Sequence, residues 1–214
     1  EEAPAPNLPD ATRAAMHETC ARAAKAWGYR SAGTGEFLVD AAGDINFLEL
    51  NARLQVEHPV TELVTGLDLV AEQLRVADGG LLTRTGVAEA VGHAIECRVN
   101  AEDPSLGFRP GAGALQVFKM PGGPGVRIDT YCEPGSVIPP YYDSMIAKLC
   151  VWAPDRARAV KRLGRALGEA RVEGVPTTLG LFREIVEDGP FVDGRYTTAY
   201  LVERAERLPA LGAV

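Results

Sequence analysis

The sequence lacks an excess of positive charge and any apolar run of membrane length, and each absence excludes a class of protein. Lysine and arginine number 22 against 29 aspartate and glutamate residues, for a formal net charge of −7. Without a basic cluster, the chain lacks the electrostatic footprint of a nucleic-acid-binding protein. No apolar stretch approaches the roughly 18 residues that a transmembrane helix needs. We therefore expect neither nucleic acid nor membrane as a partner.

Cysteines are also few and show no pairing pattern. The four stand at positions 20, 97, 132 and 150, without zinc-site spacing, and three of them lie within apolar helix or strand patterns. This distribution is typical of buried free thiols in a reducing compartment. No charged and apolar leader is present at the start of the sequence. We therefore expect a cytoplasmic protein.

A run of alternating polar residues is the most informative stretch that is present. FLELNARLQVEHPVTE, at residues 47–62, has polar groups at every second position over nine residues: Glu49, Asn51, Arg53, Gln55 and Glu57. In an extended chain all five side chains lie on one face, about 7 Å apart along the strand. Such a row predicts a set of ligands, and the alternative is the solvated face of a hairpin.

The segment before this run supplies a partner for it. Residues 35–40 and 45–51 have the composition of two strands, and residues 41–44 that of a turn. In a hairpin with this four-residue loop, Glu36 lies opposite Glu49. Because like charges placed opposite each other destabilise a sheet, we expect a cation between the two carboxylates. Oxygen ligands favour Mg²⁺ or Mn²⁺, although a register slip of one residue would separate the pair.

The remaining elements fall into two groups, which predict an α+β fold with two domains. Helical patterns at residues 10–27 and 68–77 flank the hairpin, and the apolar stripe of the first is expected to pack on the hairpin's other face. The period changes at His93, so we place the domains at residues 1–80 and 93–207. The second domain is predicted to contain antiparallel strands and then helices, at residues 93–102, 114–118, 126–128, 145–152, 155–171, 177–187 and 197–207.

Cap residues set the predicted ends of these helices. Asp10, Asp155 and Thr177 have the side chains of N-caps, and Gly189 with Pro190 ends the helix before them. His58 precedes a proline, which favours an extended or turn conformation in residues 52–59.

At this point the sequence resembles a known family. The segments GTGEFLVD, FLELNARLQVEHPVTELVTGLDLVAEQLRVADG, HAIECRVNAED and PPYYDSMIAKL closely resemble the biotin carboxylase subunit or domain of biotin-dependent carboxylases such as acetyl-CoA and propionyl-CoA carboxylase. The resemblance runs from Glu1 to about Leu201. It implies the C-terminal part of an ATP-grasp domain followed by a biotin carboxylase C-terminal domain.

The resemblance implies a reaction in two steps. ATP phosphorylates bicarbonate to carboxyphosphate, and the carbon passes to biotin on a carrier protein or domain, from which a carboxyltransferase partner uses it. Glu36, Glu49 and Asn51 match the family's metal ligands, and Glu36 and Glu49 therefore also face ATP. Leu38 matches a residue of the adenine pocket, although an ordinary core position explains it equally well.

The other matched residues divide between bicarbonate and biotin. Arg53 matches the arginine that binds bicarbonate, with Gln55 and the backbone N–H of Val56 beside it, and a planar guanidinium suits a planar carbonate. Glu57 matches the general base, and Arg98 matches the arginine that stabilises the biotin enolate. From the residues alone, each arginine is equally well an ion-pair partner of a neighbouring glutamate.

Some features of the family are absent from the sequence. It has no N-terminal domain, glycine-rich lid, nucleotide-contacting lysines or biotin-attachment motif, so we expect a fragment that is inactive alone and receives biotin on another domain or chain. Pro124 stands where some relatives have an interface aromatic, which leaves a homodimer open. Two alternatives remain: a carbamoyl-phosphate or carboxylate-amine ligase of the same superfamily, and a folded assembly module without catalysis.

Overall fold

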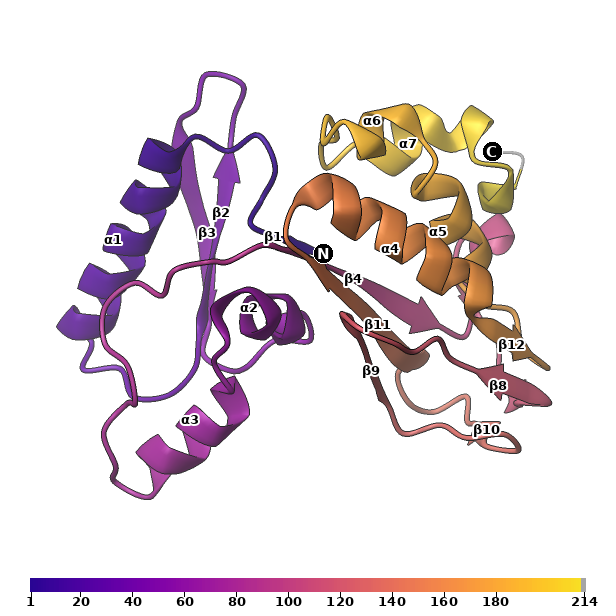
Figure 1. Cartoon of the computed structure of the whole chain (residues 1–214), viewed down its shortest axis with the longest axis horizontal. Coiled ribbons are helices and arrows are strands. Elements are labelled where there is room, and N and C mark those ends of the chain that lie inside the picture. The colour runs from indigo at the N-terminus through magenta and orange to yellow at the C-terminus, as the bar shows by residue number, and fades with distance from the viewer. Residues whose placement is uncertain (213–214) are drawn as a thin grey trace. The chain divides into compact units, whose positions relative to one another are not determined.

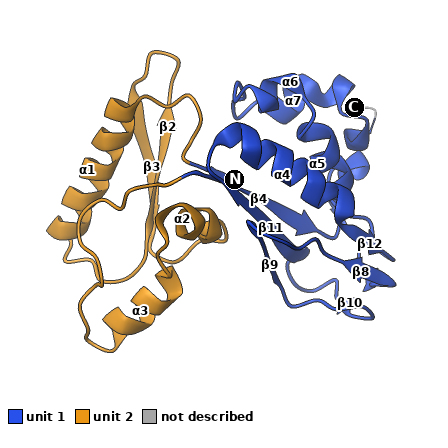
Figure 2. Cartoon of the chain, viewed as in Figure 1, with its two compact units in different colours: residues 1–3, 92–214 blue, residues 4–91 orange. Residues whose placement is uncertain are grey.

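The computed structural model describes residues 1–212 and has two compact units (Figures 1 and 2). Unit 2 is the continuous segment Pro4–Val91, whereas unit 1 combines Glu1–Ala3 with the chain from Gly92 onward. Helices and strands occur in both, which confirms the α+β class. The predicted first domain, residues 1–80, begins with residues 1–3, which the structure places in unit 1. No helix in the described part of the chain is long and apolar enough to cross a membrane.

Unit 2 is built on an antiparallel hairpin. Its elements are α1 (Asp10–Ala26), β2 (Thr34–Val39), β3 (Ile45–Asn51), α2 (His58–Thr65) and α3 (Leu69–Ala77).

The ends of the unit 2 helices test the predicted caps. The prediction that Asp10 caps α1 is wrong, because Pro9 holds that position and Asp10 lies in the first turn, where its charge suits the helix dipole. Asp68 caps α3 by accepting a hydrogen bond from the Ala71 backbone N–H at 2.8 Å. The short helix α2 was not predicted. Pro59 lies in its first turn, where a missing N–H costs nothing.

The hairpin has the predicted pairing of Glu36 with Glu49, but the turn and the register of the strands between them differ from the prediction. Near the turn Val39 pairs with Ile45, so the predicted four-residue loop is wrong. The register then shifts between Glu36 and Phe37, because Leu48 is an extra residue on β3 with no partner in the ladder. This β-bulge restores the expected register at the carboxylates and rotates the strand on either side of it.

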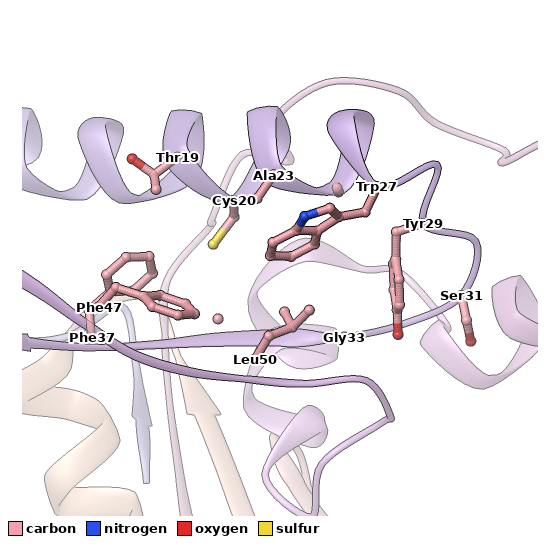
Figure 3. A pocket seen from close by; sticks show the side chains of 12 residues that line it. Thr19, Cys20, Ala23, Trp27, Tyr29, Ser31, Gly33, Phe37, Phe47 and Leu50 are labelled. Atoms are coloured by element: carbon pink, nitrogen blue, oxygen red, sulfur yellow. The ribbon is translucent and has the colours of Figure 1, made fainter.

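The bulge also sorts the apolar side chains onto the face covered by α1. Figure 3 shows Phe37, Phe47 and Leu50 facing Cys20 and other residues of the helix across a cavity of about 410 Å³. The two phenylalanine rings meet edge to face, with centroids 5.6 Å apart. The predicted packing of α1 on the hairpin is therefore confirmed, although the contact is incomplete: Trp27, at the end of the helix, is 60% exposed.

Unit 1 contains a four-stranded antiparallel sheet in the order β1-β4-β11-β9, with α4 along one face (Figure 1). The strands are β1 (Glu2–Ala3), β4 (His93–Asn100), β9 (Val126–Thr130) and β11 (Met145–Ala153), and the helix is α4 (Arg156–Glu169). Alternate residues of β4 and β11 are apolar and pack under α4, as Val99, Leu149 and Leu167 illustrate. Asp155 caps α4 as predicted, accepting from the Arg158 backbone N–H at 2.8 Å.

Several shorter elements complete unit 1. They are β5 (Glu102–Asp103), β6 (Arg109–Pro110), β7 (Gly113–Ala114), β8 (Val117–Lys119), β10 (Val137–Ile138), β12 (Arg171–Glu173), α5 (Leu179–Ile185), α6 (Gly189–Val192) and α7 (Tyr200–Arg204), with 3₁₀ turns at Pro104–Leu106, Ala205–Arg207 and Pro209–Leu211. The strand predicted at residues 114–118 is two strands, because β7 pairs with β10 and β8 with β12.

Two predictions about helix ends in unit 1 are wrong. The residue before α5 is Thr178, not Thr177, and its hydroxyl does not cap the helix. Instead that hydroxyl accepts from the Asn100 backbone N–H and donates to the Arg98 carbonyl, both at 3.0 Å, so it fixes the end of β4. The helix before Gly189 and Pro190, α5, already ends at Ile185. Gly189 and Pro190 instead form the first turn of α6, where proline is accepted.

The two-residue strand β1 is held to unit 1 by the side chain of Glu2. This carboxylate is almost fully buried and accepts hydrogen bonds from His93 Nε2 at 2.5 Å, from Arg156 Nε at 2.8 Å and from the Tyr196 hydroxyl. Burial alone would raise the pKa of Glu2, but these hydrogen bonds outweigh it and lower the pKa to about 2. Glu2 therefore stays ionised and joins β1 to three other segments of the unit.

Candidate functional site

The predicted ligand cluster forms on the hairpin face opposite α1. Asn51 Nδ2 donates to Glu36 Oε1 at 2.7 Å and to Glu49 Oε1 at 2.9 Å, and Gln55 Nε2 donates to Glu36 Oε1 at 2.9 Å. One amide nitrogen therefore joins the two carboxylates. Side chains from β2, β3 and the following loop converge at this point although 19 residues separate Glu36 from Gln55.

The donor set of this cluster suits a divalent cation. Two carboxylates and an amide are hard ligands of the kind that Mg²⁺ and Mn²⁺ prefer, and the carboxylates repel each other without a positive charge between them. Gln55 Oε1 is buried here and has no hydrogen-bond partner, so an acceptor stands ready beside the carboxylates. Residues 1–212 hold no group of three or more histidine, cysteine, aspartate or glutamate side chains that could bind a metal.

The polar row does not continue as a strand beyond Asn51, which corrects the prediction of a single extended face. Residues 52–57 form a loop that ends where α2 begins. Arg53 is exposed in this loop and donates to the Leu54 carbonyl at 3.3 Å. Gln55 turns back to the carboxylates, while Val56 and Glu57 are half-buried just before α2. The structure thus brings together four of the predicted side chains, those of Glu36, Glu49, Asn51 and Gln55. Arg53 and Glu57 lie in the same loop as Gln55, and not on an extension of β3.

His58 and Leu38 have surroundings that bear on their assigned roles. The His58 ring, through Nδ1, lies 2.9 Å from the Gln55 carbonyl, and Nε2 lies 3.9 Å from Glu62. These contacts join the loop of residues 52–57 to the first turns of α2. Leu38 is 47% exposed, so an ordinary core position does not describe it.

Arg98 lies on β4 in unit 1 and has a partner that the sequence did not suggest. Its Nη2 atom is 2.6 Å from Glu1 Oε1, an ion pair between adjacent strands. Lys148 of β11 stands opposite Arg98 in the ladder and lies 3.5 Å from Asp129 of β9. The face of β4 that carries Arg98 is therefore part of a row of charged groups that continues across the sheet.

Sequence reasoning missed Glu96, two residues before Arg98 on β4. Its side chain is only 1% exposed, and burial, followed by the nearby charge of Glu1, raises the pKa of Glu96 to about 7. Strand alternation puts Glu96 on the same face as Arg98, and nothing in the sequence pattern indicates that the Glu96 side chain is buried there. The signal available was a glutamate in the middle of a strand whose other residues are mostly apolar.

The cysteines behave as predicted for buried thiols. All four are free, and Cys97, Cys132 and Cys150 are buried. Burial raises the pKa of Cys97 to about 12 and raises that of Cys150 as well, so both remain protonated.

Comparison with known proteins shows the same division of the chain. Residues 96–203 match the family model of the biotin carboxylase C-terminal domain, and residues 1–85 match that of the carbamoyl-phosphate synthase L chain, ATP binding domain. The two matches meet close to Gly92, where unit 1 resumes. The chain belongs to the biotin carboxylase family.

Individual relatives agree with this assignment. The chain is 50% identical over 204 residues to biotin carboxylase of Nostoc sp., covering 95% of this chain and 46% of that protein. It is 46% identical over 203 residues to biotin carboxylase 1 of Bacillus subtilis, covering 94% and 45%. The chain therefore spans slightly less than half the length of these relatives.

A solved structure extends the likeness to the fold. The biotin carboxylase domain dimer of Hydrogenobacter thermophilus 2-oxoglutarate carboxylase, in complex with MgADP, ADP and bicarbonate, superimposes with a TM-score of 0.94 at 43% identity. The match covers 100% of this chain and 47% of that one.

Proposed function

We propose that this chain is part of an enzyme that uses ATP and bicarbonate to carboxylate biotin on a carrier protein or domain. The observation that carries the proposal is the contact of one amide, that of Asn51, with the carboxylates of both Glu36 and Glu49. Two carboxylates held this close together repel each other, and a cation bound between them would remove that repulsion. The bicarbonate and MgADP seen in the Hydrogenobacter domain support the same substrates.

On the nucleotide side, Glu36, Glu49 and Asn51 would hold Mg²⁺ or Mn²⁺, and Leu38 would lie against the adenine of ATP. A bound cation would neutralise charge on the phosphates during phosphoryl transfer. Gln55 keeps Glu36 in place through its hydrogen bond of 2.9 Å, so the loop after β3 supports the ligand geometry. The exposed face of Leu38 offers apolar surface to a flat base.

On the bicarbonate side, the loop of residues 52–57 supplies the remaining groups. The Arg53 guanidinium would bind bicarbonate through paired hydrogen bonds, with Gln55 and the Val56 backbone N–H as further donors. Glu57 would accept the bicarbonate proton, a task that suits a half-buried carboxylate. Because these residues follow β3 within six positions, the strand that carries the metal ligands also positions them.

On the biotin side, Arg98 would stabilise the negative charge that develops on biotin as its ring nitrogen is deprotonated. The partners are a biotin carboxyl carrier protein or domain and a carboxyltransferase, in a cytoplasmic enzyme. A homodimer is supported by the dimeric Hydrogenobacter domain. The match of residues 96–203 to the biotin carboxylase C-terminal domain favours this function over a carbamoyl-phosphate or carboxylate-amine ligase.

The decisive experiment separates the two half-reactions in the complete enzyme, with phosphate release and carboxybiotin formation measured independently. Glu57→Gln should abolish bicarbonate-dependent ATP cleavage, because an amide cannot accept the proton. Arg98→Ala should keep much of that cleavage and lose about a hundredfold or more of the biotin carboxylation. Arg53→Ala should impair both steps.

Arg158→Ala, on an arginine that is 68% exposed on α4, is the matched control and should change neither rate. If Arg98→Ala stopped phosphate release as fully as Glu57→Gln, Arg98 would have to be reassigned to bicarbonate or nucleotide.

A further inference from the structure

The sheet face that carries Arg98 also holds a buried carboxyl group for which the proposed function has no use. Glu96 is 1% exposed, and its Oε1 atom has no hydrogen-bond partner. Its Oε2 atom accepts only the weak Cys150 thiol donor, at 3.5 Å. Burying a carboxylate with so few donors costs far more free energy than burying a protonated carboxyl. The surroundings therefore favour the neutral form of Glu96.

A second carboxylate stands directly across from it. β1 pairs with β4 so that Glu2 faces Ile95, which places Glu1 opposite Glu96, and the Glu1 amino nitrogen donates to the Glu96 carbonyl at 2.9 Å. Two carboxylates in this relation do not both ionise readily. Glu1 is the one with a cation, since Arg98 lies 2.6 Å away on the diagonal. The ion pair with Arg98 thus belongs to Glu1, and the proton is assigned to Glu96.

We propose that Glu96 is a positioning residue that keeps a proton beside Arg98, so that the arginine is balanced by one carboxylate and not by two. This inference rests on the proposed role of Arg98 at the biotin side. Glu96 and Arg98 are two residues apart on one strand face, about 7 Å along the chain. Ionisation of Glu96 would add a negative charge at that distance and oppose a developing oxyanion next to the guanidinium.

The other charged groups around Glu96 do not stabilise its ionised form enough to displace the proton. Lys148 and Cys150 face it from β11, and the charge of Lys148 is balanced by Asp129 on β9, 3.5 Å from its Nζ. The Glu1 side chain, just before β1, faces it from the other side. Burial and Glu1 raise the pKa of Glu96, and these two effects outweigh Lys148 and Cys150, which lower it.

The first test measures the proton itself, in this 214-residue chain. Carbon-13 labelling of glutamate side chains, followed by NMR across pH 4 to 9, should show one carboxyl that titrates near pH 7. Glu96→Gln should remove that signal. Glu1→Gln, which leaves Glu96 in place, should move it to lower pH, because the facing charge is gone. A Glu96 signal that titrates with the exposed glutamates, or one that Glu1→Gln leaves unmoved, would overturn the proposal.

The second test measures the consequence in the complete enzyme. The kcat for carboxybiotin formation should fall above pH 7, by up to about tenfold per pH unit, while Glu96→Gln should keep a flat profile in this range. Phosphate release should have the same pH profile in both proteins. Glu133→Gln, at an exposed site, is the control and should behave like the parent.

The outcomes separate this inference from the proposed function. If Glu96→Gln leaves the pH profile of carboxybiotin formation unchanged, Glu96 is only a buried structural residue and the inference is wrong. If Arg98→Ala has no effect on carboxybiotin formation, the proposed role of Arg98 fails instead, whatever the NMR titration shows for Glu96.

Discussion

At the scale of single residues, the contacts of Glu49 define what its loss should do. Its carboxylate is exposed and shares the Asn51 amide with Glu36, so no buried packing depends on it. In the complete enzyme, Glu49→Gln should therefore raise the concentration of Mg²⁺ or Mn²⁺ needed for half-maximal activity, with little change in thermal stability. Metal titration of ATP cleavage measures this. An unchanged metal requirement would show that Glu36 and Glu49 are not the ligands.

Glu2 gives a prediction about acid stability. Its pKa falls from an ordinary value near 4.5 to about 2 in the folded chain, so the stability it adds is complete above pH 4.5 and disappears as the pH falls toward 2. A shift of this size corresponds to roughly 3 kcal/mol at neutral pH. Urea unfolding of the 214-residue chain should show Glu2→Gln destabilised at pH 7 and nearly equal to the parent near pH 2.

The same measurement on Glu133→Gln supplies the control, since that glutamate is exposed. A Glu2→Gln deficit that stayed constant from pH 7 to pH 2 would mean that shape, and not charge, makes Glu2 important.

At the scale of elements, β3 shows what the sequence predicts and what it leaves out. The predicted pairing of Glu36 with Glu49 is observed, but it depends on two irregularities that cancel: the turn is one residue longer than predicted, and the bulge at Leu48 shifts the register back. Strand alternation placed Phe47 on the face of Glu49, and the bulge at Leu48 reverses this. An irregularity of one residue depends on packing against α1, which no local pattern records.

The loop and cap predictions failed for a related reason. Residues 52–59 have the composition of a turn, yet the last two of them, His58 and Pro59, form the start of α2. Thr178 was available as a helix cap and instead bonds to the end of β4, a partner 78 residues away in sequence. Side chains with several good partners are assigned by the tertiary fold, whereas Asp155 caps α4 through a local contact and was predicted correctly.

The packing of α1 on the hairpin can be tested at Gly35. A methyl group at this position would lie 2.6 Å from Cys20 Sγ, closer than real contacts allow. Gly35→Ala should therefore push α1 away from β2 and destabilise the chain by about 1 to 3 kcal/mol in denaturant unfolding.

Gly180→Ala is the matched control. Gly180 lies in α5 with nothing near the added methyl group, so this change should be neutral or stabilising by about 0.5 to 1 kcal/mol. Equal effects of the two substitutions would show that α1 does not pack closely at Gly35.

At the scale of the whole molecule, the proposed ligands Glu36, Glu49 and Asn51 would account for only one side of a nucleotide site. Phosphoryl transfer depends on groups placed on both sides of the phosphates. The 214-residue chain alone should therefore release no phosphate from ATP above background in the presence of bicarbonate and free biotin. Turnover near that of a complete biotin carboxylase would contradict this expectation and show that these residues suffice.

The discontinuity of unit 1 has a consequence for the order in which the chain folds. Glu2 contacts His93 across 91 residues and Tyr196 across 194, and closing the longer loop costs about 0.6 kcal/mol more in chain entropy, since its length is roughly doubled. During synthesis from the N-terminus, Glu2 is made before all of unit 2 and before its partners His93 and Tyr196. Unit 2 has all its residues within one continuous segment and can form earlier. Residues 1–3 must therefore remain without their partners in unit 1 until the whole of unit 2 has been synthesised.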